Sequence, residues 1–211
     1  GAPSIVVQAI GSLMTYGMNL ILAAFGSAQT VFGIYFKLQS FVFMPVFGLN
    51  NGMVPIIAYN YGAGHKDRVI KTIKHSVAYG VGIMFVGLLA MHIFPAQLMR
   101  MFDAEESLIA IGAPALETIS LSFVFAGFCI VAGSVFQALG NGVYSMIVSV
   151  ARQMCVLLPV AKLLSLSGEV TLIWWAFPIA ELASVLLTSY FLVRIYRKVI
   201  CHIGEPVVQD A

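Results

Sequence analysis

Charged residues are scarce in this sequence. Lys, Arg, Asp and Glu together make up 9% of the 211 residues, whereas hydrophobic residues make up 60%. An ordinary globular domain has roughly 25% charged residues, which cover its water-facing surface. So few charges exclude a typical water-soluble fold and indicate a protein embedded in a lipid bilayer. The net charge of +2 is also too small to indicate a nucleic-acid partner, and we expect none.

Cysteines and the common ligand motifs are equally sparse. The three cysteines Cys129, Cys155 and Cys201 form no CxxC pair, so neither a disulfide framework nor a zinc site is expected. The segment YNYGAGHKDRV at 59–69 is rich in glycine and cations, but it lacks the GxxxxGK spacing of a phosphate loop. We interpret it as a helix end followed by a basic loop. With no HExxH, GxSxG or paired aspartates either, we expect neither an enzyme nor a cofactor.

Six apolar stretches are each long enough to cross a bilayer as a helix, which needs about 20 residues. They are continuously apolar, whereas the strands of a membrane barrel alternate. The predicted fold class is therefore an all-α polytopic membrane protein, with a transmembrane region over 1–198 and a cytoplasmic tail over 199–211. We expect Pro45 to Pro55 to form a bent or broken segment. The predicted spans are about 5–25, 30–58, 76–98, 108–138, 143–165 and 171–193.

The connections between the spans alternate in charge. The predicted 59–75 loop carries four Lys or Arg residues, and the end of the chain carries Arg194, Arg197 and Lys198. The loop around 99–107 is mostly acidic. The positive-inside rule therefore predicts that both chain ends are cytoplasmic in a plasma or inner membrane. The chain begins at Gly1 with no basic segment before the first apolar run, so we expect a piece of a longer protein without a signal peptide.

Three stretches resemble one transporter family. FKLQSFVFMPVFGLNNGMVPIIAYNYGAGHKDRV (36–69) is similar to the second helix of a lobe, and the loop after it, in multidrug and toxic compound extrusion (MATE) transporters. VFQALGNGVYSMIVSVARQMCVLLPV (135–160) resembles the FQALG end of one helix of that family and the RQ and LP of the next. WWAFPIAELAS (174–184) resembles the start of its last helix. The likeness covers nearly the whole chain, in order.

The resemblance implies that this chain is the C-terminal six-helix lobe of a twelve-helix transporter. It implies a partner in the N-terminal lobe, which this sequence does not contain. It further implies alternating access and export of small organic cations or amphipathic drugs, coupled to the influx of Na⁺ or H⁺. A lipid-linked oligosaccharide flippase of the same superfamily, or a non-transporting membrane subunit, remains an alternative. A flippase would be expected to carry more cations in its cavity.

Ionisable residues inside spans are costly and are candidates for functional sites. At 1.5 Å per residue, Arg152 lies about 14 Å deep and Glu181 about 15 Å deep on sequential antiparallel spans, so we expect them to pair near the midplane. Lys37, about 10 Å deep, and Glu117, about 14 Å deep, could form a second pair in the outward half. Each pair could be purely structural. Alternatively, Glu117 or Glu181 faces the cavity and binds a substrate cation or the coupling ion.

Neutral polar residues inside the spans serve packing or line a cavity. Packing is the commoner role, and the cavity-lining alternative suits Asn19, Gln39 and Gln137 best. Some MATE transporters place a carboxylate in the first helix of this lobe and another in the fourth. This sequence has Gln8 near the first position and no acid in the inner half of the fourth span (FCIVAGSVFQ). The coupling acid could therefore belong to the other lobe.

Overall fold

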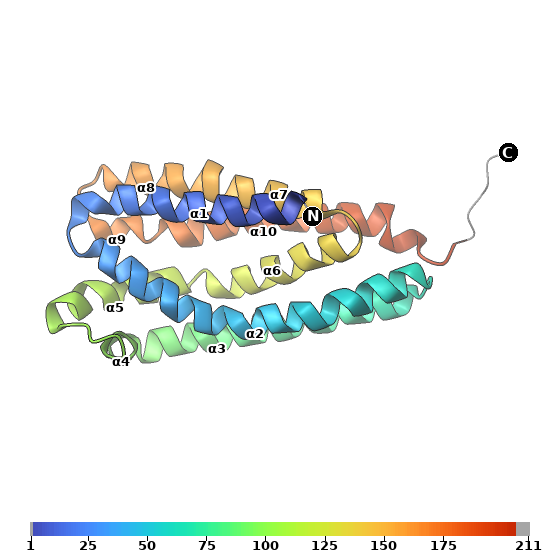
Figure 1. The fold of residues 1–211 in the computed structure, drawn as a ribbon, viewed down its shortest axis with the longest axis horizontal. Helices are drawn as coiled ribbons and strands as arrows, with labels where there is room; N and C mark the ends of the chain where they lie inside the picture. Colours follow the sequence, from blue (N-terminus) through green and yellow to red (C-terminus); the bar gives the residue numbers. More distant parts are fainter. Residues whose placement is uncertain (1, 206–211) are drawn as a thin grey trace.

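The computed structural model describes residues 2–205, and its long elements are all helices (Figure 1). Within that range five helical segments are long and apolar enough to cross a membrane, and a sixth results if α5 and α6 form one bent span. This confirms the predicted all-α polytopic fold class. The elements are α1 (Ala2–Leu22), η1 (Ala23–Phe25), α2 (Ala28–Gly62), α3 (Lys66–Ile93), α4 (Pro95–Arg100), α5 (Glu106–Ser120), α6 (Phe123–Ala138), α7 (Gly142–Val150), η2 (Ala151–Leu157), α8 (Leu158–Ser165), α9 (Val170–Ile173), α10 (Ala176–Lys198) and η3 (Ile200–His202).

The predicted 59–75 loop is far shorter than expected. α2 continues to Gly62 and α3 begins at Lys66, so only three residues connect them. The expectation was wrong because Lys and Arg are good helix formers, and a membrane helix can continue beyond its apolar core. Gly64 ends α2 in a left-handed conformation (φ 76°), and the His65 amide donates to the Asn60 carbonyl at 2.9 Å.

The residues after α10 pack against this same turn. Ile200 and Ile203 are buried, and the Lys66 ammonium donates to the Cys201 carbonyl at 3.3 Å. Gly204 lies so close to Gly64 that an added Cβ would meet the Gly64 carbonyl oxygen at 2.8 Å. Of the predicted 199–211 tail, 199–205 therefore bind to the end of the bundle, whereas 206–211 lie outside the described residues.

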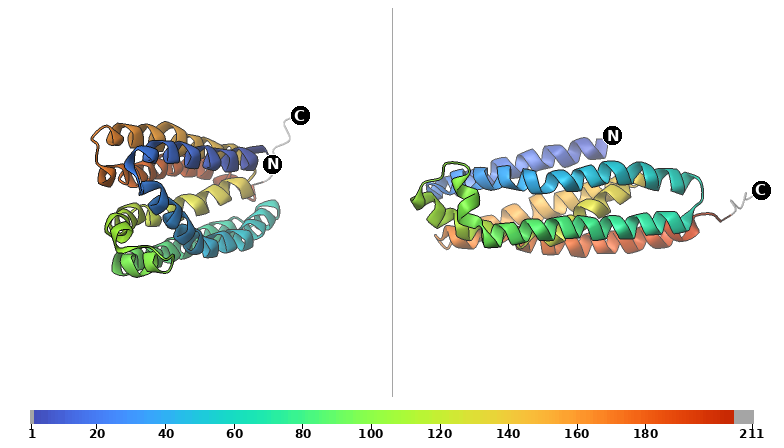
Figure 2. Two further views of the ribbon diagram at one scale, coloured as in Figure 1. Left: turned by 60° about the vertical axis from the view of Figure 1, so that its left-hand side comes forward. Right: turned by 90° about the horizontal axis from the view of Figure 1, so that it is seen from below.

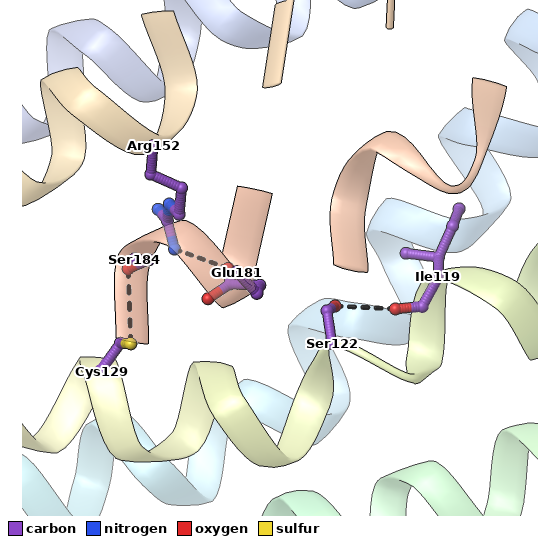
Figure 3. A network of polar contacts seen from close by, with 6 residues as sticks. All are labelled: Ile119, Ser122, Cys129, Arg152, Glu181 and Ser184. Atoms are coloured by element: carbon purple, nitrogen blue, oxygen red, sulfur yellow. Dashed lines mark hydrogen bonds and ion pairs between the residues drawn. The ribbon is translucent and has the colours of Figure 1, made fainter. Parts of the chain in front are cut away.

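The helix break lies in the fourth span rather than the second. α2 runs unbroken through Pro45 and Pro55, although its ribbon bends about midway along its length (Figure 1). α5 and α6 meet at an angle of 49° across Leu121 and Ser122. The Ser122 hydroxyl donates to the Ile119 carbonyl at 2.7 Å, and the Ser122 amide donates to the same carbonyl at 3.1 Å (Figure 3).

α6 lies between two groups of helices (Figure 2). It packs against α2 and α3 on one side and against α7 and α10 on the other, while α1 packs on α7 and α8. The approach of α6 to α3 is close because Gly80 faces Gly127, where an added Cβ would meet the Gly80 carbonyl oxygen at 2.9 Å. α6 thus fixes how far α10 stands from α2 and α3.

Candidate functional site

A cavity of about 810 Å³ opens among the helices, lined by residues of α1, α2, α6, α7, η2 and α10. One part of its wall is aromatic, another part is aliphatic, and the remainder carries amide, hydroxyl, thiol and charged groups. A wall of this mixed kind can hold a ligand that has a flat apolar body and a polar or charged group. The aromatic residues are Tyr35, Phe36, Phe43, Phe47, Phe136 and Phe177.

Arg152 and Glu181 form an ion pair on the wall of this cavity (Figure 3). The Arg152 Nη1 donates to the Glu181 Oε1 at 2.9 Å, and the two side chains are 24% and 11% exposed. They are the only Lys, Arg, Asp or Glu side chains on the cavity wall within residues 2–205. The sequence-predicted pair is therefore present, and its opposite charges neutralise each other.

A π-helical stretch brings Arg152 into position. η2 covers Ala151–Leu157 and interrupts the fifth span between α7 and α8. A π-turn widens the helix and shifts the faces of the residues beyond it, and such turns are frequent at functional sites. Here both Arg152 and its neighbour Gln153 line the cavity, as do Ser149 one turn before and Leu157 one turn after.

A buried polar contact next to the pair joins α10 to α6. The Ser184 hydroxyl, one turn after Glu181, donates to the Cys129 Sγ at 3.3 Å (Figure 3). Ser184, Cys129 and Thr188 all line the cavity, and Thr188 is 1% exposed. The contact fixes the rotation of α10 relative to α6, and so it holds the Glu181 carboxylate toward Arg152.

Several buried oxygen atoms of the cavity residues accept no hydrogen bond from any described residue. A buried polar atom without a partner is rare and needs an explanation. A ligand, an ion or a rearrangement of the helices could supply the missing donors. The atoms are Gln39 Oε1, Asn50 Oδ1, Gln153 Oε1, Glu181 Oε2 and the Thr188 hydroxyl.

The neutral candidates divide into two groups. Gln8, Gln39 and Gln137 line the cavity together with the Arg152–Glu181 pair. Asn19 does not, and the expectation that it lines the cavity is wrong. Its side-chain amide donates to the Thr15 carbonyl of its own helix at 3.1 Å. Asn19 satisfies its polar group locally near the end of α1, away from the cavity.

The second expected ion pair, Lys37 with Glu117, does not form. The Lys37 ammonium lies over the Phe102 ring, 5.7 Å from its centroid. Glu117 has no ion-pair partner within residues 2–205 and does not line the cavity. The depth counted from the sequence put Lys37 and Glu117 at similar levels of the membrane. Their side chains nevertheless form no ion pair with each other.

Sequence reasoning missed several cavity residues. Tyr35, Cys129, Ser184 and Gln153 all line the cavity. Ser184 lies three residues after Glu181, and Gln153 lies directly beside Arg152, so their proximity to the predicted pair was available as a signal. Nothing in the sequence marks Tyr35 or Cys129, because single aromatic and thiol residues are common in apolar spans.

A helical bundle with a mid-depth ion pair and an amphipathic cavity defines a polytopic membrane protein of the transporter class. The MatE family model matches residues 3–163. The chain therefore belongs to the MATE family of multidrug efflux transporters, as its motifs predicted.

Sequence relatives agree with this assignment. The chain is 25% identical over 199 residues to the multidrug export protein MepA of Staphylococcus haemolyticus, covering 94% of this chain and 44% of that protein. It is 27% identical over 183 residues to MepA of Staphylococcus aureus strain N315, covering 86% of this chain and 40% of the relative. The chain thus spans less than half the length of these relatives.

Solved structures agree as well. The MATE multidrug transporter DinF-BH is 33% identical, with a TM-score of 0.80 over 95% of this chain and 45% of that one. The Vibrio cholerae MATE transporter VcmN in its bent form has a TM-score of 0.85 at 18% identity, covering 96% of this chain and 46% of that one. The second likeness concerns the fold alone.

Proposed function

We propose that this chain is one lobe of a secondary active antiporter that exports amphipathic or cationic compounds by alternating access, coupled to the influx of Na⁺ or H⁺. The observation that carries the proposal is the mid-depth Arg152–Glu181 pair on the wall of an aromatic-lined cavity of about 810 Å³. The aromatic wall would hold the apolar body of a drug, and the carboxylate would attract its cationic group.

The pair suits a switch because Glu181 can exchange partners. The Arg152 guanidinium is the cationic neighbour of the carboxylate when the cavity is empty. A substrate cation or a coupling ion would compete with Arg152 for that carboxylate. A ligand that binds one arrangement of the pair better than the other shifts the balance between inward- and outward-facing states.

A second lobe completes the transporter in this proposal. The chain covers 44% of MepA and 45% of DinF-BH, which leaves room for another bundle of similar size. Gln8 lines the cavity where some family members have an acid, so Glu181 is the only acid available to the cavity from the described part of this lobe. A further coupling acid would come from the other lobe.

The proposed orientation has both chain ends on the cytoplasmic side of the plasma or inner membrane. Its support is that two basic clusters lie at one end of the bundle. The start of α3, with Lys66 and Arg68, contacts the segment after Arg197 and Lys198 through the Lys66–Cys201 hydrogen bond. The positive-inside rule assigns such clusters to the cytoplasm.

Transport by the full-length two-lobe protein in proteoliposomes tests the proposal. Export of a fluorescent organic cation should depend on an imposed Na⁺ or pH gradient. Glu181→Gln should lower both the export rate and its dependence on the gradient at equal amounts of folded protein. Unchanged coupling together with lower expression would show that Glu181 is purely structural.

The flippase alternative receives no support from the cavity charges. A lipid-linked pyrophosphate needs several unneutralised cations, whereas Arg152, the one cavity Lys or Arg within residues 2–205, is already paired with Glu181. Export of a cationic or amphipathic compound therefore remains the function that the site supports best.

A further inference from the structure

A second hollow lies on the outside of the bundle, between α2 and α3. It has a volume of about 450 Å³ and is lined by one face of α2 (Gly48, Gly52 and Ile56 among others) and one face of α3 (Lys71, His75 and Tyr79 among others). We call it the α2–α3 groove. The Arg152–Glu181 site does not use it, and none of its lining residues lines the central cavity.

The groove faces away from the central cavity. On α2, Phe43 and Phe47 line the cavity, while Gly52 and Ile56, each nine residues further on, line the groove. Nine residues are about two and a half turns of helix, so the two sets lie on opposite faces of α2. A second lobe that closes the cavity would leave this face toward the lipid.

Glycines make the groove hollow. A Cβ built on Gly48 or on Gly52 would meet no atom within 4 Å. The glycines are thus not required by close packing inside the lobe, unlike Gly80 and Gly127, where an added Cβ would clash. A hollow of this kind in a lipid-facing surface admits a slender apolar chain.

The groove changes from polar to apolar along its length. Lys71, Thr72 and His75 lie at the end near the α2–α3 turn, and Gly48 and Leu49 at the other end. Eight residues separate Lys71 from Tyr79 and Ile56 from Gly48, so each wall runs about 12 Å into the membrane. The His75 Nδ1 donates to the Lys71 carbonyl at 2.8 Å, and the ring stacks on Tyr79, so the imidazole is held against α3.

The polar end is cationic and unneutralised. Lys71 has no acidic partner in the described part of the chain, and neither have the neighbouring Arg68 and Lys74. The nearest acid in sequence is Asp67. An anionic group placed at this end would therefore meet a positive field, and a long Lys side chain at a helix end can reach the headgroup region.

We propose that the α2–α3 groove binds one anionic phospholipid from the leaflet on the side of the α2–α3 turn. Its phosphate lies at Lys71, and one acyl chain lies over Gly48 and Gly52. A glycine pair at this spacing can also mark a helix–helix contact. The unneutralised cations favour a lipid, because an apolar helix would bring no charge to them.

Native mass spectrometry of the full-length two-lobe protein tests this. The wild type should retain one phosphatidylglycerol in preference to phosphatidylcholine. Lys71→Gln should lower that preference about fivefold, the effect of one cation near an anionic lipid. Lys74→Gln is the matched control, because Lys74 lies in the same basic segment but does not line the groove. Equal effects of the two variants would mean diffuse surface attraction and would overturn the proposal.

Filling the groove with a larger side chain gives an independent test of the proposal. Gly52→Leu should remove the retained lipid without a change in unfolding temperature, because its side chain enters open space. Gly33→Leu is the control, since Gly33 also lies on α2 with open space around it but outside the groove. Three results contradict the proposal: lipid retained in Gly52→Leu, lipid displaced by inorganic phosphate alone, or a wild-type dimer that Gly52→Leu dissociates. Gly52→Ala replaces the leucine variant if that one fails to fold.

Discussion

Depth counted from the sequence placed two pairs of opposite charges at similar levels, and only one of the pairs forms a contact. Arg152 and Glu181 approach to 2.9 Å on the cavity wall. Lys37 instead lies over Phe102, and Glu117 does not line the cavity. The difference lies in how the helices are connected. Only four residues, 166–169, join α8 to α9 and so lead to α10, whereas α3 and α4 separate α2 from α5.

A short hairpin fixes the relative depth of its two helices, and here the π-helical stretch and the Ser184–Cys129 contact set their facing. Depth counted from the sequence then predicts which two charges lie at one level. For helices that are distant in the chain, depth leaves the rotation about the helix axis open, and a residue at the right level can face lipid, core or cavity. Matched substitutions in the two pairs test whether only one of them contributes to stability.

The largest effect is expected when Glu181 is removed. Glu181→Ala leaves the mostly buried Arg152 without its partner and should lower the free energy of unfolding by about 3 kcal/mol. Glu117→Ala is the matched variant and should cost about 0.5 kcal/mol or less. Denaturant unfolding in detergent measures both values. Equal losses of unfolding free energy at Glu181 and Glu117 would show that the two pairs do not differ.

Exchanging the two charges should recover much of that loss. Arg152→Glu and Glu181→Arg each place two like charges together, whereas the double variant restores one charge of each sign. We expect a favourable coupling of about 1–3 kcal/mol in a double-mutant cycle. The same cycle on Lys37 and Glu117 should give no coupling. A double variant that is as unstable as the sum of its single changes would mean that the contact contributes little.

A smaller effect should follow from widening the gap between α3 and α6. Gly127→Ala places a Cβ 2.8 Å from Met84 and should cost about 1–3 kcal/mol through overpacking. It should also disturb the Ser184–Cys129 contact, and through it the Glu181 side of the cavity. Gly82→Ala on α3 is the control, because nothing lies within 4 Å of its added Cβ. Comparable unfolding temperatures for the two variants would show that α6 does not set this spacing.

The smallest effect is expected at Lys37. Lys37→Gln loses only an exposed contact with the Phe102 ring, so the stability should fall by about 0.5 kcal/mol. Lys37→Arg should keep the contact and the stability. A loss at Lys37→Gln as large as that at Glu181→Ala would show that Lys37 has a partner beyond Phe102.

The sequence alone was sufficient for the spans, the family and the central ion pair. Long apolar runs, charge-bearing connections and the short 166–169 hairpin are local features, and each has a direct physical meaning. Helix boundaries near charged residues were harder to predict from the sequence, because α3 begins at Lys66, inside the predicted 59–75 loop. The sequence marks where the hydrocarbon core ends, but the helix continues past that point.

Other features arise only from packing. The π-helical stretch at Ala151–Leu157 and the break at Leu121 and Ser122 contain no sequence signal that distinguishes them from continuous helix. The facing of Asn19, Lys37 and Glu117 depends on helix rotation, which depth does not determine. The cavity residues Tyr35 and Cys129 became visible only when α2, α6 and α10 were brought together.

Substrate protection of engineered thiols tests most directly whether the cavity is the transport site. In full-length protein with Cys129 replaced by Ser and with Cys155 and Cys201 replaced by Ala, Gln137→Cys would place a thiol at an exposed position on the cavity wall. Lys37→Cys would place one at an exposed position outside the cavity. We predict that an exported cation slows modification of the Gln137→Cys variant by a thiol reagent and leaves the Lys37→Cys variant unaffected. Protection at Lys37→Cys but not at Gln137→Cys, or equal protection at both, would contradict the account.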